Sequence, residues 1–242
     1  MTYCVGLLLK AGMVLLSDTR TNAGLDNIAT YRKMFTFERP GERVIAIMTA
    51  GNLSVTQTTL ARLAEAANDP EACEARSILR APTMLDVAGI AGEMLSQVMV
   101  ETTQRMDRMH QSASASLIVA GQRQGGPMRM FLVYPEGNFI EATEDTPYLQ
   151  IGEHKYGKPI LDRVVTADMS LADARKAVLL SMDSTLRSNL SVGMPLDLVV
   201  IERDTFAVAE ERRIEPSDEA FAALSAAWSG ALREAFTRIG ER

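Results

Sequence analysis

The sequence predicts an α+β protein in which two antiparallel sheets are stacked between layers of helices. Strand patterns and helix patterns alternate in blocks along the 242 residues. Their spacing lacks the strand–helix–strand repeat that a Rossmann fold or a barrel requires. Because two stacked sheets between helical layers would bury the apolar stripe of every predicted element, we expect one four-layer αββα domain over residues 1–242.

The first fifty residues have the pattern of strands. Apolar residues fill positions 3–9 and 13–17, and a short Gly-containing turn separates the two runs. Two more strands are predicted at 34–38 and 43–49, on either side of a Pro-Gly turn. Each pair is therefore predicted to form an antiparallel hairpin.

Helical periodicity then takes over. Asn52 is placed to cap a first helix, whose apolar residues recur every three or four positions. Thr83 opens a longer helix with an apolar stripe from Leu85 to Met99. The sequence thus predicts two amphipathic helices after the first strands.

The second half repeats this order and adds a last helix. Further strands and helices are expected in the order strand 116–120, strand 128–134, strand 139–141, helix 157–164, helix from Ser170, strand 196–201 and strand 206–211. Ser217 is predicted to cap the last helix. The buried face of that helix should carry Phe221, Leu224, Trp228, Leu232 and Phe236.

Composition excludes several classes of protein. With 47% hydrophobic and 23% charged residues, the chain is an ordinary globular protein. A net charge of −6, with arginines scattered among acids, argues against nucleic-acid binding. No apolar run approaches the roughly 18 residues of a membrane span. Cys4 and Cys73 form no CxxC motif, so we expect free thiols in a cytoplasmic protein.

Common catalytic and metal-binding motifs are missing from the sequence. There is no GxxxxGK[ST] loop and no GxSxG nucleophile turn. The two histidines, His110 and His154, lie far apart without metal-ligand spacing, and both are expected to be structural. We therefore expect neither a metal nor another cofactor.

Thr2 offers a different chemistry. If Met1 is removed, Thr2 has a hydroxyl group and a free α-amine, whose ordinary pKa is about 7.7–8.0. Such an amine can accept the hydroxyl proton near neutral pH, so one residue supplies both the nucleophile and its base. Many unrelated chains also begin with Met-Thr, so this pair alone indicates little.

Residues at three strand ends strengthen the case for Thr2. Asp18 ends the second predicted strand and Lys33 precedes the third, so the two can meet beside the first strand. A lysine cation there would favour the alkoxide form of the threonine. Gly51 lies between a strand and a helix, where free backbone N–H groups can stabilise an oxyanion. Separately, each has a structural explanation, as an exposed acid, a solvated lysine or a helix cap.

In this order and spacing, the pieces resemble the proteasome β-subunit family. The resemblance covers essentially the whole chain. It rests on Thr2, residues 12–20, Arg32-Lys33-Met34, Thr49-Ala50-Gly51 and residues 187–193. The opening residues 1–6 and the block Thr21-Asn22-Ala23-Gly24 are also similar to Anbu, a bacterial proteasome-like family.

The resemblance implies the fold of N-terminal nucleophile hydrolases and a role for each matching residue. It makes Thr2 the nucleophile, with Lys33 tuning it and Asp18 orienting that lysine. The Gly51 N–H would form the oxyanion hole, and Ser191 would support the amine of Thr2. Thr21 and Gly51 would present backbone groups to an extended peptide, and Tyr31 and Thr49 would line its first pocket.

The resemblance also has departures and open points. Ser188 stands where β subunits carry an aspartate, and Glu153 stands where they carry a serine. Both changes affect the surroundings of the amine, and Thr2 is exposed only if Met1 is removed. Related subunits assemble into rings or open helical washers, so a homo-oligomer is expected. Whether an unfoldase delivers substrate stays open.

Three functions are compatible with these residues. The first is a threonine peptidase that acts on short or unfolded peptides inside a self-assembled ring. The second keeps the fold but hydrolyses small amides, because fold does not fix function. The third is a catalytically silent scaffold subunit.

Overall fold

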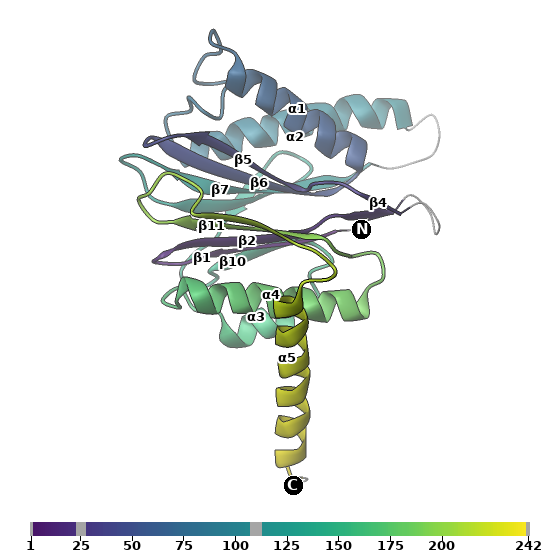
Figure 1. Cartoon of the computed structure of the whole chain (residues 1–242). Helices are drawn as coiled ribbons and strands as arrows, with labels where there is room; N and C mark the ends of the chain where they lie inside the picture. The colour runs from purple at the N-terminus through teal and green to yellow at the C-terminus, as the bar shows by residue number, and fades with distance from the viewer. Residues whose placement is uncertain (1, 23–27, 107–112, 241–242) are drawn as a thin grey trace.

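The computed structural model describes residues 2–22, 28–106 and 113–240, and its centre is a pair of stacked antiparallel sheets (Figure 1). One sheet has the strand order β10-β1-β2-β11-β12. Its strands are β1 (Tyr3–Leu8), β2 (Gly12–Asp18), β10 (Tyr148–Gly152), β11 (Leu196–Glu202) and β12 (Glu210–Ile214). We call it the nucleophile sheet after the role expected of Thr2, which directly precedes β1.

The other sheet has the order β5-β6-β7-β8-β9. Its strands are β5 (Met34–Arg39), β6 (Arg43–Gly51), β7 (Ala115–Arg123), β8 (Arg129–Val133) and β9 (Phe139–Glu141). A small ribbon of β3 (Arg20–Asn22) and β4 (Ile28–Thr30) lies between β2 and β5 in the sequence.

Helices cover both outer faces of this pair of sheets (Figure 1). Helices α1 (Leu53–Asn68) and α2 (Met84–Met106) pack on the second sheet, and α3 (Lys158–Val164) and α4 (Leu171–Ser188) pack on the nucleophile sheet. The predicted four-layer αββα sandwich is therefore confirmed. Helix α5 (Glu219–Arg238) starts at the α3–α4 layer and projects away from it.

Alternation along the strands creates three separate apolar layers. In β6, Ile45 and Ile47 pack toward α1 and α2, whereas Val44, Ala46 and Met48 pack between the sheets. In β1, alternate residues likewise face the inter-sheet layer or the layer beneath α3 and α4. Because the side-chain period of a strand is two, each strand can serve two layers at once.

The predicted strand boundaries hold except near β12. The predicted strand at 206–211 is wrong, because β12 pairs with β11 only from Glu210 onward. Asp204 and Phe206 have φ angles of +63° and +56°, so this stretch is a turn. Buried Gln122 holds the turn by accepting from the Asp204 N–H and donating to its carboxylate. Strand β10 and the β3–β4 ribbon were not predicted.

The last helix differs most from its prediction. Asp218, rather than Ser217, caps α5 by accepting from the N–H of Phe221. None of its residues is buried, and the exposed fractions of Leu232 and Phe236 are 50% and 82%. The predicted buried face is therefore wrong within one chain, since only the start of α5 packs on α4. An amphipathic pattern shows that a face is apolar but not what covers it.

Two smaller expectations can also be compared with the structure. Cys4 is a buried free thiol and Cys73 an exposed one, as predicted. None of the helices in the described residues combines the length and the apolar character of a membrane span.

Candidate active site at the start of the first strand

The centre of the candidate site is a buried ion pair between two strand ends. Asp18 is the last residue of β2, and Lys33 immediately precedes β5. The Lys33 ammonium donates to Asp18 Oδ1 at 2.8 Å, and the two side chains are 5% and 0% exposed. Lys33 also donates to the Arg20 carbonyl at 2.5 Å. The acid and the lysine that the sequence separates by a ribbon therefore meet as predicted.

The same carboxylate is bound to the backbone beside Thr2. Asp18 Oδ1 accepts from the N–H of Tyr3 at 3.1 Å, and Oδ2 accepts from the N–H of Gly193 at 3.2 Å. On the other side of Thr2, its carbonyl accepts from the N–H of Glu153 at 2.7 Å. Thr2 is itself buried, so its backbone is fixed on both sides next to the ion pair.

The environment of Asp18 acts on its charge in two opposite ways. Burial is the larger effect, and it raises the pKa of the Asp18 carboxyl above that of an exposed aspartate. The Lys33 ammonium and the N–H groups of Tyr3 and Gly193 oppose this rise by stabilising the carboxylate. The ionised pair therefore depends on all of these partners being in place.

Gly51 and Thr49 approach the site from the end of β6. The N–H of Thr49 donates to the Lys33 carbonyl at 2.9 Å, which ties β6 to the lysine. Gly51 has a φ of +109°, and a Cβ atom there would lie 2.2 Å from the Ser114 carbonyl oxygen. Only glycine fits this turn from β6 into α1. The residue predicted to form the oxyanion hole therefore lies on a turn two residues beyond the hydrogen bond between Thr49 and Lys33.

Ser191 lies in the segment after α4 that folds back on Asp18. Its N–H and its hydroxyl both donate to Asn189 Oδ1. The backbone is anchored by Arg20, which donates to the Leu190 carbonyl at 3.0 Å and packs against Gly193. The hydroxyl proton of Ser191 is therefore committed to Asn189, and only its lone pairs are left to accept a further hydrogen bond.

The predicted substrate-binding residues lie around the same strand ends. Thr21 is in β3 and pairs with Ala29 of β4. The N–H of Tyr31 donates to the Thr19 carbonyl at 2.8 Å, and the Tyr31 side chain is 40% exposed. Thr49 is buried. Ala23 and Gly24, from the motif that follows Thr21, lie outside the described residues.

Several residues of the site were not identified from the sequence. Tyr3, Gly152 and Asn189 bind or bracket the predicted residues. Tyr3 and Asn189 lie in stretches that carry the family resemblance, but the sequence assigned a role to none of the three. Gly152 has a φ of +83°, and a Cβ there would lie 1.9 Å from the Thr2 carbonyl oxygen. A glycine after the alternating run 148–152 was the one available signal for this close approach.

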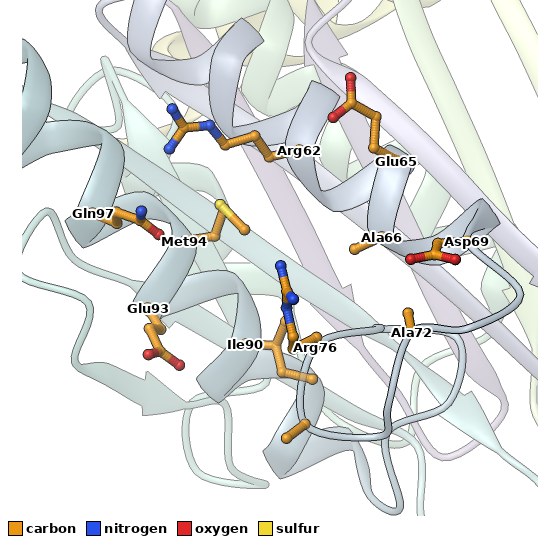
Figure 2. A pocket seen from close by; sticks show the side chains of 11 residues that line it. Arg62, Glu65, Ala66, Asp69, Ala72, Arg76, Ile90, Glu93, Met94 and Gln97 are labelled. Atoms are coloured by element: carbon orange, nitrogen blue, oxygen red, sulfur yellow. The ribbon is translucent and has the colours of Figure 1, made fainter.

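One cavity among the described residues lies away from Thr2. It measures about 630 Å³ and lies between α1, α2 and the segment that connects them (Figure 2). Its lining mixes arginines and acids, including Arg62, Glu65, Arg76 and Glu93. Because this cavity is on the outer helical layer, it is separate from Thr2.

The ring Nδ1 of His154 lies 3.1 Å from the Gly152 carbonyl oxygen and contacts none of the predicted site residues. His110 is outside the described residues.

Comparison with known proteins gives a consistent result. Residues 2–201 match the proteasome subunit family. An Anbu mutant from Hyphomicrobium sp. strain MC1 is 50% identical, with a TM-score of 0.92 and coverage of 100% of this chain and 99% of that one. No match was found among the curated proteins compared with this chain.

Two further solved structures agree with it. Anbu from Yersinia bercovieri, described as an ancestral β-subunit, is 41% identical, with a TM-score of 0.92 over 100% of this chain and 99% of that one. A helical assembly of the Anbu complex from Pseudomonas aeruginosa is 44% identical, with a TM-score of 0.93 over 100% and 98%. The chain belongs to the proteasome subunit family and, within it, to the Anbu proteins.

Proposed function

We propose that this chain is an N-terminal threonine peptidase that works within a self-assembled oligomer. The observation that supports this most strongly is the double role of Asp18 Oδ1, which accepts from both Lys33 Nζ and the N–H of Tyr3. One carboxylate oxygen thereby holds the lysine cation against the residue bonded to Thr2. Buried ion pairs contribute little net stability, so stability alone does not explain this pair. A role in catalysis beside Thr2 does explain it.

The first half of the proposed reaction forms an acyl-enzyme. With Met1 removed, the α-amine of Thr2 takes the proton of Oγ, and Oγ bonds to the carbonyl carbon of the peptide. The carbonyl oxygen becomes an oxyanion, which the N–H of Gly51 stabilises. When the C–N bond breaks, the protonated amine returns its proton to the leaving peptide amine, and an ester on Thr2 remains.

The second half releases the product. A water molecule gives a proton to the α-amine and adds to the ester carbon through a second oxyanion. Collapse of this intermediate breaks the bond to Oγ, which recovers the proton and restores Thr2. In both halves the Lys33 cation lowers the cost of negative charge on Oγ, and Asp18 fixes the lysine's position.

Turnover by the Thr2→Ala variant tests the proposal. We expect the wild type to cleave a panel of fluorogenic peptides, Thr2→Ser to retain part of that activity, and Thr2→Ala to have none. Peptide cleavage that survives in Thr2→Ala would contradict the threonine mechanism. A parallel panel of small amides separates a peptidase from an amidohydrolase, because the latter would hydrolyse only the small amides.

A silent scaffold is the second candidate, and one observation favours it. The Ser191 hydroxyl donates to Asn189, and Ser188 is exposed where related subunits carry an aspartate, so both predicted supports of the amine are altered. If the wild type with a free Thr2 cleaves neither peptides nor amides, the scaffold reading replaces the peptidase.

The proposed oligomer is a ring or an open helical washer of identical chains. Its support is the helical assembly of the Pseudomonas aeruginosa relative and the uncovered apolar stripe of α5. Both cysteines are free thiols, which fits action in the reducing cytoplasm. Peptides or unfolded proteins are the proposed substrates, and an unfoldase would be needed only for folded ones.

A further inference from the structure

Tyr3, the residue that follows Thr2, carries a hydroxyl that a core position does not need. Its side chain is fully buried between the nucleophile sheet and helices α3 and α4. The hydroxyl lies 2.6 Å from Ser181 Oγ of α4 and accepts from Gln150 Nε2 of β10 at 2.5 Å. Because Gln150 is the donor in its bond, the single phenolic proton is left for Ser181.

Burial of the Tyr3 hydroxyl favours the hydrogen bonds that it forms with Ser181 and Gln150. It raises the pKa of the Tyr3 hydroxyl, so the group stays protonated and remains a donor at neutral pH. Three polar side chains are brought together in an apolar layer, where losing one partner leaves the others unsatisfied. Phenylalanine would fill the same volume without that requirement, so the hydroxyl group itself must be accounted for.

The chain also leaves room for the hydroxyl. At Gly157, just before α3, a Cβ atom would lie 2.2 Å from Ser181 Oγ and 2.6 Å from the Tyr3 hydroxyl oxygen. A side chain at this position would therefore displace one of the two groups. The pocket around the hydroxyl thus combines two hydrogen-bond partners with a position that has no side chain.

The backbone of Tyr3 is tied to the candidate catalytic pair. Its N–H donates to Asp18 Oδ1, and Tyr3 faces Gly152 in the register of β1 with β10. One residue is therefore fixed at two points, through its hydroxyl to α4 and β10 and through its N–H to Asp18. Any shift of β1 along its own axis would break the hydroxyl's bonds to Ser181 and Gln150. It would also move Thr2 relative to Asp18.

We propose that the Tyr3 hydroxyl positions the threonine nucleophile by locking β1 against Ser181 and Gln150, and so sets the place of Thr2 beside Asp18 and Lys33. This inference rests on the proposed threonine mechanism. Tyr3 touches neither substrate nor the reacting atoms, so it is a positioning residue. A displacement of about 1 Å at a reacting group can lower a rate about 100-fold, so a small axial shift is enough to matter.

The test compares Tyr3→Phe and Ser181→Ala with the wild type and with Tyr148→Phe as a matched control. Tyr148 is also a tyrosine with side-chain hydrogen bonds, but its partners, Asp162 and Lys158, lie in α3 rather than against β1. Two readouts are used: kcat and KM on a fluorogenic peptide, and the rate of Thr2 modification by a peptide epoxyketone. That reagent needs both the hydroxyl and the amine of Thr2, so it reports their placement directly.

We expect Tyr3→Phe to lower kcat and the modification rate about 10- to 100-fold, with KM within about twofold of wild type. Ser181→Ala should behave similarly, and the double variant should be no worse than Tyr3→Phe, because both changes break one network. Tyr148→Phe should leave both readouts unchanged. Denaturation curves confirm that every variant is folded at the assay temperature.

Three results would overturn the inference in different ways. If the wild type reacts but Tyr3→Phe has an equal kcat and modification rate, the positioning role is wrong and the threonine mechanism stands. If KM rises while the modification rate is unchanged, Tyr3 acts on substrate binding instead. A wild type with a free Thr2 that neither turns over nor reacts would overturn the mechanism and, with it, the positioning role.

Discussion

Lys33 Nζ lies 2.8 Å from Asp18 Oδ1, and both side chains are almost completely shielded from solvent. Asp18 ends β2 of the nucleophile sheet and Lys33 directly precedes β5 of the second sheet, so this ion pair joins the two sheets at the end where Thr2 lies. Replacing such a pair with apolar residues is often harmless, whereas removing one member leaves a buried, unpaired charge.

Lys33→Ala should abolish turnover and lower the free energy of unfolding by about 3–5 kcal/mol, because it leaves the Asp18 carboxylate buried without its cation. Urea denaturation at neutral pH measures the second effect. Arg32→Ala is a suitable control, since that neighbouring cation forms an exposed ion pair with Glu211 and should change stability by under about 1 kcal/mol. A fully stable Lys33→Ala protein would contradict the buried pair.

The stability deficit of Lys33→Ala should shrink as the pH falls. Burial raises the pKa of Asp18, and loss of Lys33 removes the main opposing effect. Between the ordinary aspartate pKa of about 3.9 and the raised value, the folded state binds more protons than the unfolded state. Between these two pKa values, the free energy of unfolding therefore increases as the pH falls. Denaturation at several pH values compares the two proteins, and a deficit that widens toward acid would show the sign to be wrong.

Gly152→Ala should reduce activity far more than Gly125→Ala. Both glycines have a positive φ, +83° and +73°, so each alanine carries a backbone cost of about 1–2 kcal/mol. At Gly152, however, the added Cβ would also lie 1.9 Å from the Thr2 carbonyl oxygen, whereas nothing lies within 4 Å at Gly125. Turnover and melting temperature of both variants separate the effect on Thr2 from general strain. Equal losses would exclude a specific effect on the nucleophile.

Ser191→Ala should move the acidic limb of the pH profile of kcat/KM to lower pH. The Ser191 proton is committed to Asn189, so the hydroxyl can only accept a hydrogen bond from the amine of Thr2. Accepting favours the charged ammonium, and removing the acceptor lowers the amine pKa. Because the reaction needs the neutral amine, the free enzyme becomes active at lower pH. An unchanged limb would mean that Ser191 does not contact the amine.

The double variant Leu232→Asp/Phe236→Asp should lower the oligomer's mass without unfolding the subunit. Both side chains are exposed on α5, at 50% and 82%, and an exposed apolar stripe of this kind marks an interface. Light scattering after size-exclusion chromatography measures the mass, and circular dichroism checks the fold. Arg233→Asp changes charge on the same helix without touching either apolar side chain, and it should leave the assembly intact. An unchanged mass for the double variant would assign assembly to another face.

Periodicity was enough to predict the layers but not the partners of each face. Residues 44–48 alternate between two apolar layers, and this alternation places β6 between helices and a sheet without further information. The stripe of α5 is equally regular, yet no part of the described chain covers its outer half. A pattern encodes which side of an element avoids water, whereas the identity of the covering surface depends on assembly.

The candidate site shows a similar division. Asp18, Lys33 and Gly51 could be predicted because Asp18 and Gly51 end strands and Lys33 precedes one, and these strand ends were expected to meet. Tyr3 could not, because its role depends on hydrogen bonds to residues up to 178 positions away in the sequence, as to Ser181. Asn189 accepts from Ser191 only two positions away, but residue type alone does not show that its side chain turns toward that serine. Strand β12 begins later than predicted for a local reason, the positive φ angles of Asp204 and Phe206. Nothing in the sequence indicated a turn at these two residues.

The most direct test of the central claim is the intact mass of the purified protein, read together with its peptide turnover. We expect a chain that has lost Met1, so that the amine of Thr2 is free, and cleavage of peptides by that chain. Cleavage by protein that retains Met1 would contradict it, because the amine could not then act as the base.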